Sequence, residues 1–254
     1  MAMRSPLLAI ACALAGSLTV SVALRGRETA TAKPVAIGFS DPLRPGRLNV
    51  QLVQGGMTIT GYDGKDVTIE ARVRAERSRG SVSNTATGLH VEEENNEVRV
   101  RALATRVVDL TIQVPRATSL KLAATHDGDI VVQNVDGDIE ATTINGSVRL
   151  DGITGGVVAH ALNGDLWVRL TRVPNGTPMS FSSMTGHIDV TLPAAARATI
   201  KAEAQRGKIV TDFDVTAPTP GLPIRVKKTL SGLINGGGPD YIFKAYHGDI
   251  DIHK

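Results

Sequence analysis

Five glycines recur at a fixed nine-residue spacing, and this period constrains the fold more than any other feature of the sequence. They stand at positions 128, 137, 146, 155 and 164. Apolar side chains occupy the second and fourth positions after each glycine: Ile130 and Val132, Ile139 and Ala141, Val148 and Leu150, Val157 and Ala159, Leu166 and Val168. The residues between them are mostly polar. This alternation predicts one short, half-buried strand in each nonapeptide.

The residues that precede the glycines predict turns between these strands. They are Asp127, Asp136, Asn145, Thr154 and Asn163. Asp and Asn tolerate the left-handed backbone conformations that turns need. The fourth position after glycine alternates large and small side chains, which indicates that like faces recur every two nonapeptides. The sequence therefore predicts an all-β, elongated β-solenoid (parallel β-helix or β-roll-like) with coils of about 18 residues and two short strands each. An antiparallel meander is the alternative.

The apolar pattern extends beyond these two positions. Seven residues after glycine we expect further inward side chains, namely Val135, Ile144, Ile153 and Leu162. Towards the C-terminus the expected inward side chains include Met179, Phe181, Met184, Tyr241, Phe243 and Tyr246. Only 3% of the residues are aromatic, so we expect a narrow core filled mainly by Ile, Val, Leu and Ala.

The repeat region extends upstream in a looser form. Strands are expected near 47–53, 56–60, 66–74, 97–103 and 106–114. Residues 76–88 are polar and are expected to form a loop, and residues 217–240, rich in proline and glycine, are expected to leave the stack. No helical period is evident after residue 32. We therefore assign residues 47–254 to the β-strand-repeat domain and residues 33–46 to a linker.

Residues 1–32 have the pattern of a signal peptide or an N-terminal anchor. Arg4 is followed by a charge-free stretch from Ser5 to Leu24, and the small residues of 21–23 and 30–32 offer two cleavage sites. The same stretch is long enough to span a bilayer, so an uncleaved anchor is the alternative. The only cysteine, Cys12, lies inside it. We expect a secreted, periplasmic or envelope protein whose mature domain has no disulfide.

The order of several motifs resembles a bacterial family of envelope proteins, the putative adhesin domains of unknown function, which contain β-strand repeats. The motifs are "GGMTITGYDGKDVTIEA", "LTIQVPRATSLKLAATHDGDIVV", "TGHIDVTLP" and "LSGLINGGGPDYIFKAYHGDIDI". Together with the "NGSVRL" and "NGDLWV" units they cover most of residues 47–253. The resemblance implies an all-β, solenoid-like fold behind a signal or anchor. It implies no catalytic residues.

The Gly-Asp turns raise a calcium hypothesis, because calcium-binding nonapeptide rolls place Asp oxygens at successive turns. Asp129, Asp138 and Asp165 fit that pattern, but Ser147 and Gly156 interrupt it. A column of Asp127, Asn145 and Asn163 along one edge can instead be held by amide hydrogen bonds. We therefore predict no metal site and no cofactor.

An enzymatic hypothesis rests on outward residues that could share one face: Glu140, Arg149, Asp151, His160 and Arg169. Clustered carboxylates of this kind cleave polysaccharides on some stacked β-folds. A solvated charged face explains the same residues. The chain has no G-x-S-x-G, H-E-x-x-H or phosphate-binding loop motif. We therefore predict that the protein is not an enzyme.

A binding role would need an exposed surface. Trp167, the only tryptophan, falls at an outward position beside Val131 and Val158 in the repeat column. The formal net charge is only +3, which does not favour a nucleic acid as partner. We expect a structural or adhesin-like role with an envelope protein or glycan as partner, and membrane contact only through an uncleaved N-terminal segment. The alternatives are a polysaccharide-active β-helix enzyme and an envelope sensor or regulatory partner domain.

Overall fold

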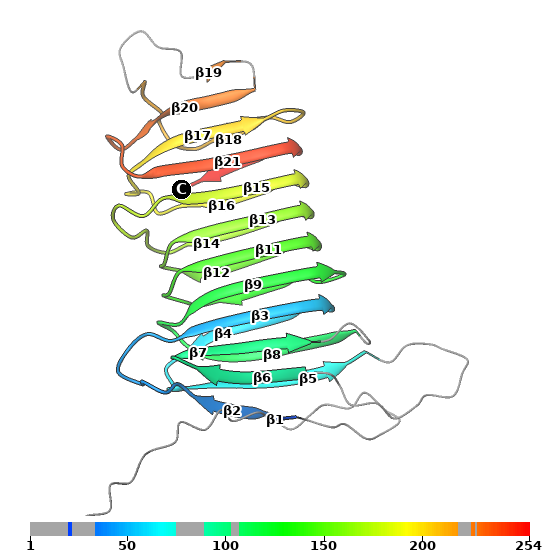
Figure 1. The fold of residues 1–254 in the computed structure, drawn as a ribbon. Helices are drawn as coiled ribbons and strands as arrows, with labels where there is room; N and C mark the ends of the chain where they lie inside the picture. Colours follow the sequence, from blue (N-terminus) through cyan, green and yellow to red (C-terminus); the bar gives the residue numbers. More distant parts are fainter. Residues whose placement is uncertain (1–19, 22–33, 75–88, 103–106, 218–224, 227) are drawn as a thin grey trace, which may run out of the picture.

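The computed structural model describes residues 20–21, 34–74, 89–102, 107–217, 225–226 and 228–254. These residues form two large β-sheets and no helix, so the all-β prediction is confirmed. Figure 1 shows the two sheets face to face in one elongated stack. Both sheets mix parallel and antiparallel strands, and neither closes on itself. Within the described ranges there is no helix with the length and apolar character needed to cross a bilayer.

Sheet A contains 12 strands. In spatial order they are β1 (Val20–Ser21), β6 (Leu89–Glu94), β7 (Glu97–Ala102), β3 (Arg47–Gln54), β9 (Ser119–His126), β11 (Ile139–Asn145), β13 (Val157–Asn163), β15 (Met179–Thr185), β21 (Asp240–His247), β17 (Ala198–Ala204), β20 (Thr229–Ile234) and β19 (Arg225–Val226).

Sheet B contains 10 strands. In spatial order they are β18 (Ile209–Thr211), β22 (Ile250–His253), β16 (Ile188–Thr191), β14 (Leu166–Leu170), β12 (Val148–Ile153), β10 (Ile130–Gln133), β4 (Met57–Tyr62), β8 (Val108–Pro115), β5 (Asp66–Val73) and β2 (Val35–Gly38).

Consecutive strands of the glycine-repeat region alternate between the two sheets, so each strand pairs with the next but one. Ile139 pairs with Val157 in sheet A, and Val148 pairs with Leu166 in sheet B, both in parallel register. Residues at equivalent positions of the repeat therefore pair when they lie two nonapeptides apart in the sequence.

The order of strands in space departs from the order in sequence at both ends of the stack. Strands β3 and β4 lie between β7–β8 and β9–β10, and β21 and β22 lie between β15–β16 and β17–β18. The interior pairs are parallel, whereas β6, β5 and β2 at one end and β20 and β19 at the other pair antiparallel. Antiparallel strands thus cover both ends of the parallel region in sheet A, and one end in sheet B.

The core lies between the inner faces of the two sheets. The predicted inward residues Ile130, Val148, Val157 and Leu166 are 0% exposed, and Ile139 is 2% exposed. Burying such a side chain contributes roughly 1.5–3 kcal/mol. Near the C-terminal end the rings of Phe181 and Phe243 from neighbouring strands stack with their centroids 5.1 Å apart. The prediction that Ile, Val, Leu and Ala fill most of the core is therefore confirmed.

Four of the expected inward residues are exposed instead, which corrects the prediction for Ile144, Leu162, Met184 and Tyr246. The strands of sheet A keep their alternation unbroken past the middle of the strand, so Thr143 is buried and the next residue points outward. In sheet B the backbone changes phase directly after β10, at Asn134 with φ 57°, and at a bulge near the end of β12, at Gly152 with φ 70°. This change turns Val135 and Ile153 inward. Only sheet B therefore follows the expected pattern at this position.

The upstream strands lie close to their expected positions, and further strands lie in segments where none was expected. Strand β2 belongs to the segment 33–46 that we expected to be a linker, and it pairs with β5. Strand β6 includes the acidic run 92–94. Strands β19 and β20 lie in the segment 217–240 that we expected to leave the stack. The expected loop 76–88 and, apart from β1, the N-terminal segment 1–32 lie outside the described residues.

Candidate functional site

The aspartates of the Gly-Asp turns bind backbone N–H groups of the neighbouring turn. Oδ1 of Asp129 accepts a hydrogen bond from the N–H of Ser147 at 2.8 Å. Oδ1 of Asp165 accepts one from the N–H of His187 at 2.7 Å. Each carboxylate therefore joins its own turn to the next one along the stack.

This column of turn contacts continues towards the C-terminal end of the stack. Oγ of Ser147 accepts a hydrogen bond from the backbone N–H of Asp165 at 3.3 Å. Oδ1 of Asp249 accepts one from the backbone N–H of Lys208 at 2.8 Å. The serine that interrupts the calcium-like pattern thus performs the same role as the aspartates. Within the described ranges, no three His, Cys, Asp or Glu side chains are placed to hold a metal ion.

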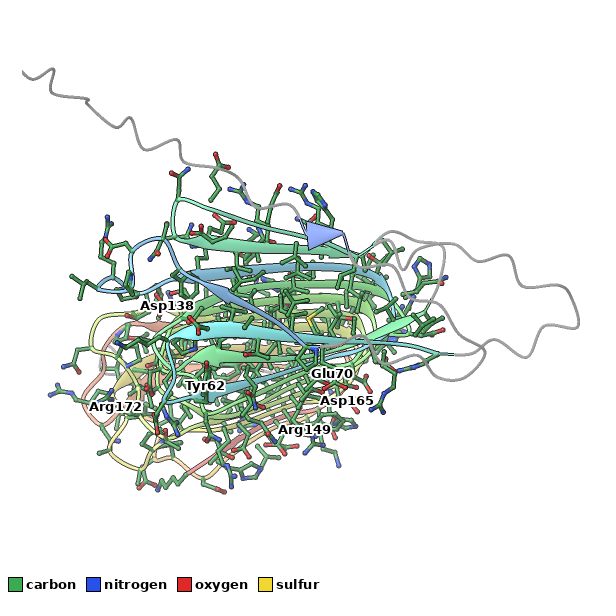
Figure 2. The ribbon with its side chains drawn as sticks, turned by 90° about the horizontal axis from the view of Figure 1, so that it is seen from below. Tyr62, Glu70, Asp138, Arg149, Asp165 and Arg172 are labelled. Atoms are coloured by element: carbon green, nitrogen blue, oxygen red, sulfur yellow. The ribbon has the colours of Figure 1, made fainter. Side chains whose placement is uncertain are left out.

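Asp138 performs the same function on the other edge of the stack. Its Oδ1 accepts a hydrogen bond from the N–H of Gly156 at 2.8 Å. Figure 2 shows Asp138 and Asp165 on opposite sides of the molecule, because successive turns alternate between the two edges of the sheets. The three aspartates of the calcium hypothesis therefore do not form a single column.

The predicted amide contact between turns is present. Nδ2 of Asn163 donates a hydrogen bond to Oδ1 of Asn145 at 3.0 Å. The glycines that follow these two asparagines are in close backbone contact. A Cβ on Gly164 would lie only 1.9 Å from the carbonyl oxygen of Gly146. The nine-residue glycine period thus has a steric origin, because the turns approach too closely for any side chain.

The candidate acid–base residues do not share a face, which corrects that expectation. Glu140 and His160 lie on the outward face of sheet A, whereas Arg149, Asp151 and Arg169 lie on the outward face of sheet B. The reason is the alternation of consecutive nonapeptides between the sheets, which sends residues nine positions apart to opposite faces. No reaction centre joins these five residues.

The two carboxylates of this set are each held by a basic neighbour on the same sheet. Glu140 contacts Nζ of Lys121 at 3.0 Å. Asp151 forms a bidentate pair with Arg169, at 2.7 and 2.9 Å. The hydrogen bonds from Arg169 hold the pKa of Asp151 below its ordinary value. Asp151 is therefore an ionised partner in a surface pair, which is unsuited to donating a proton.

His160 and Ser182 form a close histidine–hydroxyl contact on the outward face of sheet A. Nδ1 of His160 lies 2.5 Å from Oγ of Ser182. The two residues are direct neighbours in the parallel register of β13 and β15. The backbone N–H groups of these strands take part in the sheet and do not form a backbone oxyanion hole beside this pair. The contact is accounted for by strand pairing.

Trp167 is half-buried on the outward face of sheet B. The guanidinium carbon of Arg149 lies 4.9 Å from the centre of the indole ring. Val131 belongs to the same row, but Val158 lies on sheet A. The expected apolar stripe around Trp167 is therefore divided between the two faces, and a cation covers part of the ring.

Sequence reasoning missed an acidic cluster around His253 at the C-terminal end of sheet B. Nδ1 of His253 lies 3.0 Å from Oδ2 of Asp212, and its Nε2 lies 3.9 Å from Asp189. The hydrogen bond with Asp212, aided by the charges of Asp189 and Asp251, raises the pKa of His253. The strand order that joins β18, β22 and β16 has no local signal in the sequence.

A second missed feature is an exposed apolar row on sheet A. Its members occupy matching positions on four neighbouring strands, and 40 to 53% of each is exposed: Ile144, Leu162, Met184 and Tyr246. The row borders a shallow hollow of about 500 Å³ that also includes Glu203 and Lys244. An exposed apolar row of this length is a typical feature of contact surfaces.

Comparisons with known proteins give matches only among solved structures. No protein-family model and no curated protein sequence matches the chain. A crystal structure of a putative cell adhesion protein from Clostridium sporogenes ATCC 15579 has a TM-score of 0.50 at 14% identity, over 87% of this chain and 99% of that chain. A putative adhesin from Bacteroides fragilis NCTC 9343 has a TM-score of 0.33 at 15% identity, over 87% of this chain and 97% of that chain. The Clostridium likeness shows a shared fold, and it agrees with the bacterial family that the sequence resembles.

Proposed function

We propose that this chain is an exported, non-enzymatic protein with a structural or adhesin-like binding role at the cell envelope. We further propose that its two sheets form a β-solenoid in which one strand from each sheet makes a coil. The observation that carries the proposal is the elongated two-sheet fold, shared with 99% of the length of a putative cell adhesion protein. Export is supported by the charge-free segment between Arg4 and Arg25.

Two features of the outward faces support binding over catalysis. The candidate carboxylates Glu140 and Asp151 lie on different sheets and are each paired with a basic side chain. A glycoside-cleaving pair would instead have to flank one bond. The outward face of sheet A also carries an exposed apolar row that is not part of the core.

Export is tested by fusing alkaline phosphatase after Lys254. The enzyme is active only outside the cytoplasm, so we expect activity in intact cells. A matched fusion from which residues 1–32 have been deleted should be inactive. Equal activity with and without this segment, or inactivity of both fusions, would refute export.

Binding is tested by incubating the purified protein with immobilised envelope fractions and with a panel of glycans. We expect retention on at least one of them, with no release of reducing ends. The Glu140→Gln and Asp151→Asn variants should be retained equally well. Release of reducing ends that disappears in either variant would identify a polysaccharide-cleaving enzyme instead.

A further inference from the structure

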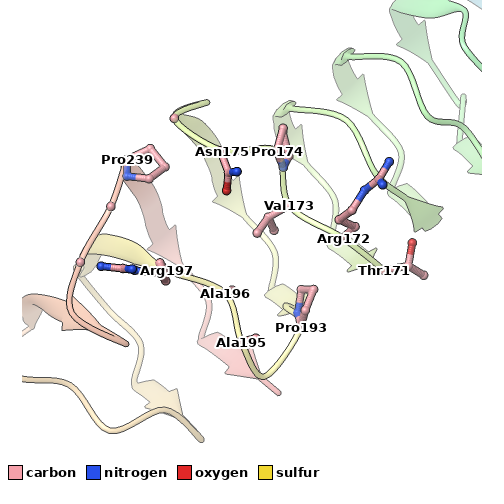
Figure 3. A pocket seen from close by; sticks show the side chains of 13 residues that line it. Thr171, Arg172, Val173, Pro174, Asn175, Pro193, Ala195, Ala196, Arg197 and Pro239 are labelled. Carbon is pink, nitrogen blue, oxygen red and sulfur yellow. The ribbon is translucent and has the colours of Figure 1, made fainter.

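Three connections that are far apart in the sequence enclose a hollow at one edge of the stack. They join β14 to β15, β16 to β17 and β20 to β21. The hollow has a volume of about 630 Å³, within the range of ligand sites. Figure 3 shows it from close by. Loops held by a rigid scaffold commonly carry binding residues.

An insertion in the repeat builds one wall of this hollow. His160 pairs with Ser182, 22 positions along the chain, whereas Asn145 and Asn163 meet at 18. The additional residues lie in the connection 171–178 and include Arg172 and Asn175. The core needs no such insertion, because the preceding strands are joined by residues 154–156 alone.

The charges around the hollow are of one sign. Arg172 and Arg197 both line it, and neither guanidinium has an ion-pair or hydrogen-bond partner among the residues that the structure describes. Within those residues no Asp or Glu lines the hollow. The carboxylate next to it in sequence, Asp240, is held by Nζ of Lys201 at 2.6 Å. The hollow is therefore complementary to negative charge.

The two guanidinium groups do not converge on one point. In Figure 3 they extend to opposite sides, with Val173 and Asn175 between them. A single small anion would reach only one of them, whereas a chain with anionic groups at intervals would reach both. Each guanidinium fork fits a carboxylate or a phosphate group in bidentate fashion.

Apart from the two arginines, the residues that line the hollow are neutral. Pro174, Pro193 and Pro239 supply fixed apolar surfaces, and the amide of Asn175 supplies both a donor and an acceptor. Apolar ring faces and hydroxyl groups are the features that sugar rings would present to such a surface. A peptide chain would also present backbone carbonyl groups, and the three prolines have no N–H to donate to them.

We propose that this hollow binds an acidic polysaccharide, a glycan chain with carboxylate or phosphate groups at intervals. Arg172 and Arg197 each bind one anionic group, and the proline surfaces contact the sugar between them. This inference rests on the proposed binding function and specifies its ligand class.

The test measures binding of the full-length protein to polygalacturonate, phosphorylated dextran and neutral dextran at about 0.15 M salt. The first two probes distinguish carboxylate from phosphate groups. We expect binding to at least one of them and none to neutral dextran. Arg172→Gln and Arg197→Gln should each weaken it roughly tenfold, since each removes one charge-assisted contact. Arg44→Gln, which removes another exposed arginine, near the other end of the stack, should leave binding unchanged.

Four outcomes would overturn the proposal. They are binding to neither acidic probe, equal binding to neutral dextran, equal weakening by Arg44→Gln, and tighter binding of poly-L-glutamate or duplex DNA than of both acidic glycans. Retention of the same protein on envelope fractions would still support the proposed function in each case. Loss of that retention as well would refute both.

Discussion

Asn163 donates a hydrogen bond to Asn145 at 3.0 Å, across two turns that lie one above the other. The residues that follow them, Gly164 and Gly146, approach so closely that a Cβ on the first would lie 1.9 Å from the carbonyl oxygen of the second. Amide contact and glycine packing thus occur at the same step of the stack. Together they explain why an Asn-Gly or Asp-Gly pair recurs in the sequence.

The inward and outward assignments of one strand can be compared directly with two isoleucines of β11. Ile139 is 2% exposed and Ile144 is 40% exposed. Ile139→Asp should unfold the domain, because an unpaired buried charge costs several kcal/mol. Ile144→Asp should change the free energy of unfolding by at most about 0.5 kcal/mol. Urea unfolding checks both values, and similar destabilisation by the two variants would contradict the assignment.

The steric role of the period glycines predicts a large difference between two glycines. Gly164→Ala should destabilise the protein by about 3 kcal/mol, since its methyl group would overlap the neighbouring backbone. A Cβ on Gly176 would meet nothing within 4 Å, although φ there is +76°. Gly176→Ala should therefore cost only about 1 kcal/mol of backbone strain. Thermal unfolding in which Gly176→Ala is the more harmful change would refute the packing argument.

The turn aspartates are predicted to act as hydrogen-bond acceptors. Asp165→Ala should lower the free energy of unfolding by about 1 kcal/mol, because the N–H of His187 loses its partner. Asp165→Asn keeps an acceptor oxygen in place and should retain most of the stability. If the Asn variant proves as unstable as the Ala variant in chemical denaturation, the charge of the carboxylate matters more than its hydrogen bond.

The raised pKa of His253 predicts a pH dependence of stability. The hydrogen bond with Asp212 favours the protonated imidazole in the folded state, whereas the unfolded value is about 6.5. The stabilisation is therefore complete below that value and is lost as the pH rises through the folded-state pKa. His253→Gln should reduce the fall in Tm with rising pH in this range. The matched control is His126→Gln, which removes a histidine outside this acidic cluster. Identical pH profiles of Tm for His253→Gln and wild type would contradict the expectation.

The sequence predicts the structure correctly where a single local pattern, either strand alternation or turn preference, determines the position of a residue. Alternation placed Ile130 and Leu166 in the core, and the Asn-Gly turns gave the contact between Asn145 and Asn163. Alternation alone could not show where the phase changes, so Ile144 was assigned to the wrong face. To place Ile144 correctly, one must know how far the strand continues before its turn. This length differs between the two sheets.

Contacts that depend on strand order were beyond sequence reasoning. The insertion of β21 between β15 and β17 aligns Tyr246 with Met184, and a similar insertion places His253 beside Asp212. Likewise, three separate connections bring Arg172 and Arg197 to one hollow. No local pattern encodes these neighbours, because they result from the chain returning to the stack from a distant position.

We expect apolar packing and turn hydrogen bonds, rather than a bound metal ion, to hold the two sheets together. The decisive experiment is thermal unfolding followed by circular dichroism, in excess chelator and again after adding calcium. In this account the turn carboxylates bind backbone N–H groups, so the β-sheet signal and the Tm should be the same in both conditions. A collapse of the β-sheet signal in chelator that calcium restores would contradict the account and make the Gly-Asp turns a metal site.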